Sequence, residues 1–132
     1  MREIKFRGKP IEDYGDTKWF YGNAIVNYED KLAYIEAPGN GCIPVEWETV
    51  GQYTGLKSKK SGKEIYEDDL VEGINYGFNN PKKYIGVVTY VYAEYLVKGV
   101  TKNNRVRDEL NVTYEVVGNI HDNPELLKGD EE

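Results

Sequence analysis

Residues 84–92 read YIGVVTYVY, and this stretch decides the fold class. Its residues are mainly aromatic or β-branched, and apolar side chains fall on both faces of a two-residue repeat. That pattern is typical of a central strand covered on each side. The glycine within it, Gly86, predicts a bend or a bulge.

Residues 110–116, LNVTYEV, show a different pattern further along the chain. Apolar and polar residues alternate, so one face would carry Leu110, Val112, Tyr114 and Val116. This alternation predicts a half-buried antiparallel strand.

Upstream, residues 19–28 and 32–36 flank a polar turn at 29–31, which predicts a β-hairpin. Residues 4–6 predict a short first strand. No long window has helical periodicity, and turn residues cluster at 38–41, 57–63 and 77–81. The chain is therefore expected to be all-β.

One short C-terminal helical turn is expected as an exception, with Asn123 as its cap, Pro124 as its first residue and Gly129 as its stop. Short strands with frequent turns favour a small barrel or sandwich, since a parallel sheet would need crossover helices, and we expect a small barrel-like domain. We expect one domain over residues 1–132, divisible into an N-terminal β-hairpin lobe (1–50) and a barrel-like lobe (51–121), followed by an acidic tail (122–132).

Composition excludes several classes of function. One cysteine and one histidine rule out an internal disulfide framework, cysteine-cluster zinc sites and histidine-rich metal centres. There is no apolar run of membrane-spanning length and no signal-peptide core at the start. These features predict a soluble cytoplasmic protein without a membrane partner. The net charge is −6, of which residues 122–132 contribute −4, so the rest of the chain is nearly balanced.

Several stretches resemble the YopX family of phage and prophage proteins. They are REIKFRGK (2–9), WFYGNAI (19–25), GQYTGLKSKKSGKEIYEDDLV (51–71), GVV from Gly86, and YEVVGNIHDNPELL (114–127). The resemblance implies an all-β, phage-derived protein of the bacterial cytoplasm, and it implies no established biochemical activity. The second half is also similar in layout to a Src-homology-3-like (SH3-like) barrel.

The family motif has Glu-Gly-Asp where this chain has Glu67-Asp68-Asp69. If that glycine takes a positive φ, Asp68 is among the few residue types that tolerate the position. Asp69 is expected to accept a backbone N–H bond and fix the turn into the next strand. The positions that carry the family signature are expected to be structural: Gly51, Tyr53, Gly55, Gly62, Asp69, Gly118 and Asn119.

Catalytic and metal chemistry find little support in the sequence. Glu67, Asp68, Asp69 and Glu72 are oxygen ligands of the kind that calcium or magnesium prefers, but their spacing is not that of an EF-hand. His121 beside Asp122 is expected to be a surface or rim histidine, because adjacent residues of an extended segment point to opposite sides. Cys42 is expected to be a small buried residue. We therefore expect no enzyme activity and no cofactor, with a carboxylate–metal hydrolase around Glu67 and Asp69 as the catalytic alternative.

After these exclusions the sequence leaves two kinds of binding function. Single-stranded nucleic acid would be held by lysine-rich loops and stacked on Tyr53, Tyr76 or Tyr84. The basic candidates fall in three loops: Lys57, Lys59, Lys60 and Lys63; Lys82 and Lys83; and Lys98, Lys102, Arg105 and Arg107. An isoelectric point near 4.9 weighs against this alternative, although it leaves nucleic acid possible.

The favoured form is protein association, with an unknown partner or with a second copy. Twelve tyrosines together with Trp19 and Trp47 exceed what one small core hides, and such residues are enriched at interfaces. The sequence therefore predicts a symmetric homo-oligomer.

Overall fold

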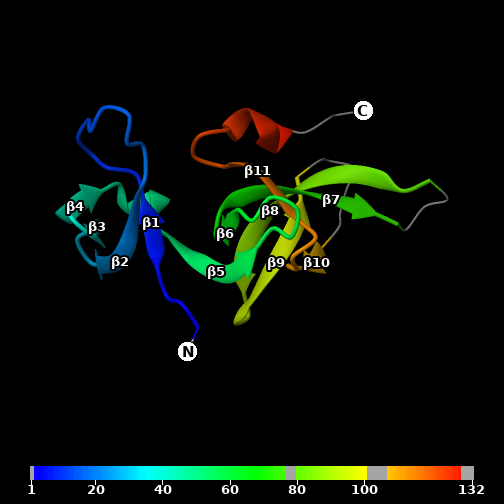
Figure 1. Ribbon diagram of the computed structural model, residues 1–132, viewed down its shortest axis with the longest axis horizontal. Coiled ribbons are helices and arrows are strands. Elements are labelled where there is room, and N and C mark those ends of the chain that lie inside the picture. Colours follow the sequence, from blue (N-terminus) through cyan, green and yellow to red (C-terminus); the bar gives the residue numbers. More distant parts are fainter. Residues whose placement is uncertain (1, 77–79, 101–106, 129–132) are drawn as a thin grey trace. The chain divides into compact units, whose positions relative to one another are not determined.

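The computed structural model describes residues 2–76, 80–100 and 107–128 (Figure 1). The chain divides into two compact units, Met1–Gly55 (unit 1) and Leu56–Glu132 (unit 2). The boundary lies inside a strand, five residues after the expected division between Val50 and Gly51.

Every regular element of the described residues is a strand or a short 3₁₀ turn, which confirms the all-β prediction. No helix in the described part of the chain has the length and apolar character needed to cross a membrane. The elements are β1 (Phe6–Gly8), β2 (Phe20–Asn27), β3 (Leu32–Ala37), β4 (Gly41–Val45), η1 (Trp47–Thr49), β5 (Gly51–Lys57), β6 (Glu64–Tyr66), β7 (Asp69–Asn75), β8 (Lys82–Val91), β9 (Glu94–Gly99), β10 (Arg107–Glu109), β11 (Glu115–Asn119) and η2 (Pro124–Lys128).

The sheet of unit 1 follows the order β4-β3-β2-β1-β5, all antiparallel. The predicted hairpin is β2–β3. In its turn the Asn27 side-chain oxygen accepts the backbone N–H groups of Glu29 and Asp30, each at 3.1 Å. Lys31 then takes a φ of 53°, which closes the turn.

Strand alternation builds the core of unit 1. Along β3 every second residue is buried, and the inward residues of its neighbours complete the cluster of Phe20, Ala33, Ile35, Ala37, Ile43 and Val45. Gly8 lies against this cluster, where an added Cβ would be 2.9 Å from Val45 Cγ2. A larger residue at that position would therefore push β1 away from the core.

The sheets of the described residues are open, so the barrel-like arrangement expected from the sequence does not close into a barrel. In unit 1 the segment after β1 does reach the edge of β4, where Pro10 forms a single bridge with Val45 and Ile11 N–H donates to the Pro44 carbonyl at 3.1 Å. On the other side of the bridge Glu46 N–H donates to the Lys9 carbonyl at 2.8 Å, whereas Pro44 has no N–H group to return a bond to Ile11. The bridge covers part of the edge without closing the sheet.

The sheet of unit 2 follows the order β10-β9-β8-β7-β11, also antiparallel, and β6 is hydrogen-bonded to β5. Residues 84–92 fall almost entirely in β8, which lies between β7 and β9, as expected of a central strand. The bend or bulge expected at Gly86 is absent, because the register passes through it unbroken. Gly86 is needed instead for close approach, since a Cβ would collide with the Val97 side chain.

The strand predicted over residues 110–116 is wrong for residues 110–114, and only Glu115 and Val116 lie in a strand, β11. β10 ends at Glu109, and the Asn111 side-chain oxygen accepts the N–H of Thr113 at 2.9 Å to form a turn. Leu110 and Tyr114 are buried while Val112 is 40% exposed, so the alternation comes from a turn and not from a strand face. Regular pairing resumes in β11, which has a bulge between Val116 and Gly118.

The C-terminal helical turn is present as η2, with Pro124 as its first residue. Asn123 does not cap it as expected. Its side-chain oxygen instead accepts the N–H of Asn119 at 3.2 Å, while its backbone carbonyl accepts the N–H of Leu126 at 3.0 Å. The asparagine therefore closes the preceding turn, and only its main chain contributes to η2.

Candidate functional site

The turn at Glu67–Asp69 is held by its neighbours in unit 2. Asp68 has a φ of 70°, which explains why a glycine suits this position and why aspartate can replace it. Its N–H donates to the Val88 carbonyl and its carbonyl accepts the N–H of Ile120, both at 3.0 Å. The strained residue is thus bonded on both sides to other elements of unit 2.

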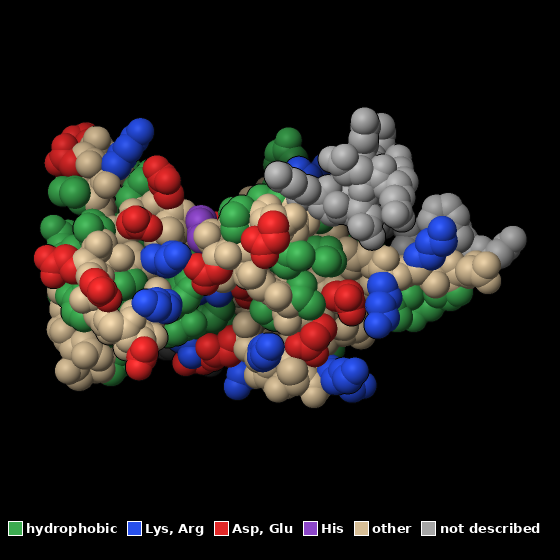
Figure 2. All heavy atoms as spheres, turned by 90° about the horizontal axis from the view of Figure 1, so that it is seen from above, with side chains coloured by type: hydrophobic (Ala, Val, Ile, Leu, Met, Phe, Trp, Pro, Cys, Tyr) green, Lys and Arg blue, Asp and Glu red, His purple; other side chains and the backbone are tan. Residues whose placement is uncertain are grey.

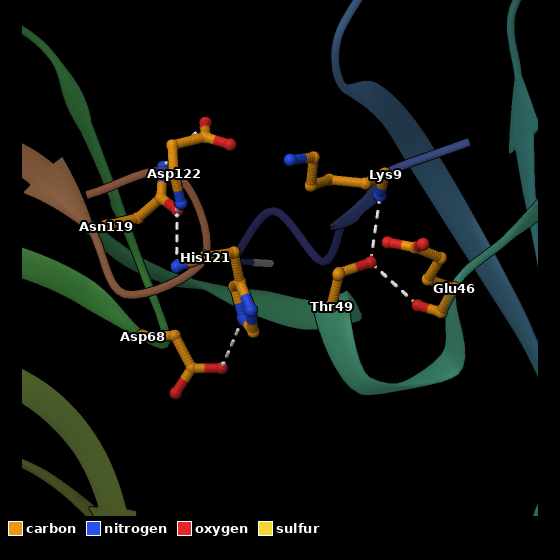
Figure 3. Close-up of polar contacts among 7 residues, drawn as sticks. All are labelled: Lys9, Glu46, Thr49, Asp68, Asn119, His121 and Asp122. Atoms are coloured by element: carbon orange, nitrogen blue, oxygen red, sulfur yellow. Dashed lines mark hydrogen bonds and ion pairs between the residues drawn. The ribbon is translucent and has the colours of Figure 1, made fainter. Parts of the chain in front are cut away.

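The single histidine meets this turn (Figure 3). Nε2 of His121 lies 3.2 Å from Oδ2 of Asp68, and the histidine side chain is 18% exposed. Its carboxylate partner is therefore Asp68, 53 positions earlier in the chain, and the adjacent Asp122 accepts a bond from the Asn119 amide at 3.2 Å. A rim position agrees with the expectation for His121, but only the fold reveals its partner.

Asn119 organises the second turn of the same region (Figure 3). Its side-chain oxygen accepts the N–H groups of His121 at 3.0 Å and of Asp122 at 2.9 Å. Gly118 precedes it, and a Cβ there would collide with the Asn123 side chain. The Gly-Asn pair is therefore required by the geometry of the turn.

The carboxylates considered as metal ligands serve separate tasks. Asp69 is buried, and its Oδ2 accepts the N–H of Tyr66 at 2.7 Å, which is the turn-fixing bond expected of it. Asp68 pairs with His121, and Glu72 Oε1 lies 3.8 Å from Lys83 Nζ. Within the described ranges, no three His, Cys, Asp or Glu side chains are grouped so as to hold a metal ion.

The remaining signature positions lie in or beside β5. Gly55 and Gly62 have φ values of 90° and 76°, so both take a conformation that favours glycine. Gly51 pairs with Arg7 of β1, and Tyr53 is buried with 6% exposure. These residues shape β5 and the loop after it.

A buried polar network in unit 2 was not foreseen from the sequence. The hydroxyls of Tyr84 and Tyr114 bond to each other, and Tyr114 donates to Asp108 Oδ2 at 2.9 Å. Burial raises the pKa of both tyrosines, and Tyr114 is raised further by its bonds to Tyr84 and Asp108. Gly73 makes room for the Tyr114 ring, which a Cβ would strike. The one local signal was Asn111, whose turn directs Tyr114 inward.

Two of the three basic loops reach one hollow of about 460 Å³ in unit 2. Lys60 and Lys83 line it, but so do the acidic residues Glu72, Asp108 and Glu115. The ionisable side chains of the lining therefore sum to a formal charge of −1. A lining with this formal charge does not favour phosphate groups.

The other basic candidates among the described residues do not line this hollow. Lys57, Lys59, Lys63, Lys82, Lys98 and Arg107 are exposed, and Arg107 pairs in register with Lys98, while Lys102 and Arg105 lie outside the described residues. On the face in Figure 2, basic and acidic side chains are interspersed. The stacking role expected of Tyr53 and Tyr84 is wrong, because each is only 6% exposed; Tyr76 is 72% exposed.

Unit 1 carries an exposed apolar surface, which we call the outer face: Ile25, Leu32, Tyr34, Cys42 and Pro44. The register places Ile25 beside Tyr34 and Tyr34 beside Pro44 in one row across β2, β3 and β4. Ile25 is 53% exposed and Leu32 is 47% exposed. The buried position expected for Cys42 is wrong, because alternation along β4 directs Ile43 and Val45 inward and Cys42 outward.

Together these features define the class: an all-β protein of two antiparallel units, with a histidine–aspartate turn in one and an exposed apolar sheet face in the other. A family model, YopX protein, matches residues 5–128, and the chain belongs to the YopX family. No curated protein matches it. Among solved structures it is similar to the crystal structure of protein EF1440 from Enterococcus faecalis, at 23% identity and a TM-score of 0.47, covering 97% of this chain and 100% of that chain.

Proposed function

We propose that this chain is a phage- or prophage-derived protein of the bacterial cytoplasm that acts by binding and not by catalysis, and that it self-associates through the outer face of unit 1. The observation that carries the proposal is the row of Ile25, Tyr34 and Pro44 across three adjacent strands, with Ile25 half exposed. Contiguous exposed apolar side chains on a sheet are typical of interfaces.

The chemistry of the outer face suits contact with a second copy. Tyr34 combines apolar area with a hydroxyl, a combination that is enriched at protein interfaces. Two copies related by a twofold axis would bury the row against itself.

Light scattering after size-exclusion chromatography tests this proposal. The monomer is 15.1 kDa, so a dimer is expected at about twice that mass at high micromolar concentration. The variant Tyr34→Lys should run as a monomer with an unchanged circular dichroism spectrum, because it places a charge in the middle of the row. Tyr92→Lys is the matched control, since Tyr92 is 94% exposed in unit 2 and the exchange should leave the mass unchanged. A natural chain that remains at 15.1 kDa would contradict the proposal.

The second candidate, binding of single-stranded nucleic acid, is favoured by the lining of one hollow, which contains Lys60, Lys83 and the exposed Tyr76. Three carboxylates in that lining weigh against it. Phosphate contacts would make the affinity fall steeply with salt, and no binding to DNA or RNA at about 50 mM salt would eliminate this candidate.

A further inference from the structure

The surface of unit 1 is hollowed on both sides of Tyr21. Two hollows, of about 780 and 480 Å³, share Tyr21, Ala37 and Pro38 in their linings, so they adjoin at these residues, and we call the pair the groove. Each volume lies in the range of protein sites that bind ligands.

One half of the groove is aromatic. Tyr14, Trp19 and Tyr21 line it, and Tyr14 and Tyr21 are 38% and 45% exposed. These rings are held in place: Tyr14 packs edge-on against Phe20 with centroids 5.1 Å apart, and Arg7 lies 4.6 Å from the Trp19 ring centroid. Fixed aromatic rings lose little conformational entropy when a partner binds.

The other half of the groove is acidic and open. Glu3, Glu36 and Lys5 are its ionisable lining residues, so its formal charge is −1. Lys5 is already paired with Glu3 at 3.4 Å, whereas Glu36 Oε1 has a neutral partner, the Asn23 amide at 3.3 Å. Gly39 and Gly41 line the same half with open space where a Cβ would lie, so a peptide can approach the backbone closely.

We propose that this groove binds an extended, proline-containing segment of a partner protein, with the prolines on the aromatic half and a lysine or arginine of the segment at Glu36. Prolines in the polyproline II conformation dock on aromatic-lined grooves, and the acidic half supplies the charge complementary to a basic residue. Strand addition is not the mode here, because β2 is flanked by β1 and β3 in the sheet. The inference goes beyond self-association and does not depend on it.

Tryptophan fluorescence tests the groove directly. In the variant Trp47→Phe, Trp19 is the one remaining tryptophan and reports on the aromatic half. The probe is a nine-residue peptide of Pro-Pro-Ala repeats that ends in arginine. We expect a saturable change with a Kd below about 1 mM, an affinity that is weaker when Ala replaces the arginine, and no binding when Gly replaces the prolines.

Two charge variants test whether the basic residue of the bound segment lies at Glu36. Glu36→Gln should weaken the arginine peptide about threefold to tenfold and leave the alanine peptide unchanged. Glu48→Gln is the matched control, because Glu48 is exposed in the same unit and does not line the groove. Equal binding of the arginine peptide to both variants would overturn the assignment of Glu36.

The result of the peptide-binding test can be distinguished from the result of the self-association test. Tyr34→Lys, which is expected to abolish self-association, should bind the alanine peptide as well as the parent protein does; the alanine peptide is used because the new lysine lies two residues from Glu36 on the same face of β3. No fluorescence change with any of the three peptides at several millimolar would overturn the groove proposal and would leave the self-association result untouched.

Discussion

The buried cluster of unit 1 consists of aliphatic side chains and one phenylalanine, whereas that of unit 2 includes two tyrosines whose hydroxyls bond to each other. In unit 1 the aromatic residues Tyr21, Tyr28 and Tyr34 remain exposed. In unit 2 the residues Tyr84 and Tyr114 are inside, and Asp108 provides the acceptor that Tyr114 needs.

The difference shows two ways in which a tyrosine-rich chain can fold. In unit 1 strand alternation leaves Tyr21 and Tyr34 on the surface, and the buried polar residues Arg7 and Thr49 lie outside its apolar cluster. In unit 2 the apolar cluster itself contains two tyrosine hydroxyls, and each buried hydroxyl must find a hydrogen-bond partner. Unit 1 should therefore respond most to lost volume, and unit 2 also to lost hydrogen bonds.

The largest effects are expected from cavities in the two cores. Ile35→Ala in unit 1 and Ile65→Ala in unit 2 each remove a fully buried side chain, so each should lower the free energy of unfolding by about 3 kcal/mol. Hydrogen exchange should show the loss of protection mainly in the unit that carries the substitution. If either variant lost exchange protection equally in both units, the comparison would be contradicted, because the two units would then unfold together as one cooperative unit.

A slightly smaller effect is expected at the turn of unit 2. Asp69→Ala removes the acceptor of the buried Tyr66 N–H and should lower the free energy of unfolding by about 2 kcal/mol. Asp16→Ala, at an exposed position in unit 1, serves as the control and should change it by less than about 0.5 kcal/mol. Urea unfolding measures both. A near-neutral Asp69 variant would show that the turn does not depend on this bond.

The tyrosine network should make the stability of unit 2 depend on pH above 10. Because burial raises the pKa of Tyr84 and Tyr114, the unfolded chain releases these protons at a lower pH than the folded protein does. The stabilisation is complete below pH 10 and decreases as pH rises, by at most about 1.4 kcal/mol per pH unit for each tyrosine.

The variant Tyr114→Phe tests that dependence. At neutral pH it should lower the free energy of unfolding by about 1 kcal/mol, because Tyr84 and Asp108 each lose a partner, and it should flatten the decline above pH 10. Tyr14→Phe, at a more exposed tyrosine of unit 1, should leave the slope unchanged. Urea unfolding between pH 8 and 11 gives both slopes, and identical slopes in all three proteins would contradict the prediction.

The smallest effect is expected at the β8–β9 turn, where Tyr92 and Ala93 have φ values of 51° and 64°. Such turns favour glycine, so Ala93→Gly should raise the free energy of unfolding by up to about 1 kcal/mol. Ala24→Gly, in the middle of β2, is the opposite control and should lower it by roughly 0.5–1 kcal/mol. Thermal unfolding distinguishes the two, and a destabilised Ala93 variant would indicate that this turn is not strained.

Much of the fold was predictable from the sequence wherever a local sequence pattern specifies the element. The hairpin of β2 and β3 followed from alternation and a polar turn, and β8 followed from its β-branched and aromatic content. The turn at Asp68 followed from the conformations that glycine and aspartate share. Each of these depends on neighbours within a few positions of the chain.

The incorrect predictions concern residues whose sequence pattern or residue type is compatible with more than one structure. Residues 110–116 alternate like a strand, but Asn111 offers the backbone an internal acceptor and a turn wins. Cys42 was expected inside because of its residue type, but its place in β4 directs it outward. For Tyr53 and Tyr84 the residue type suggested a surface role, although both lie inside.

Local sequence therefore determined the all-β class, the central strand, the first hairpin and the two turns at Asp68 and Asn119, because turn geometry and side-chain alternation are short-range properties. Tertiary structure alone decided which tyrosines are buried, which carboxylate meets His121, and how the outer face and the groove of unit 1 are assembled. Those outcomes depend on residues far apart in the chain, whose proximity is set by strand order and register, and no local pattern encodes either of these.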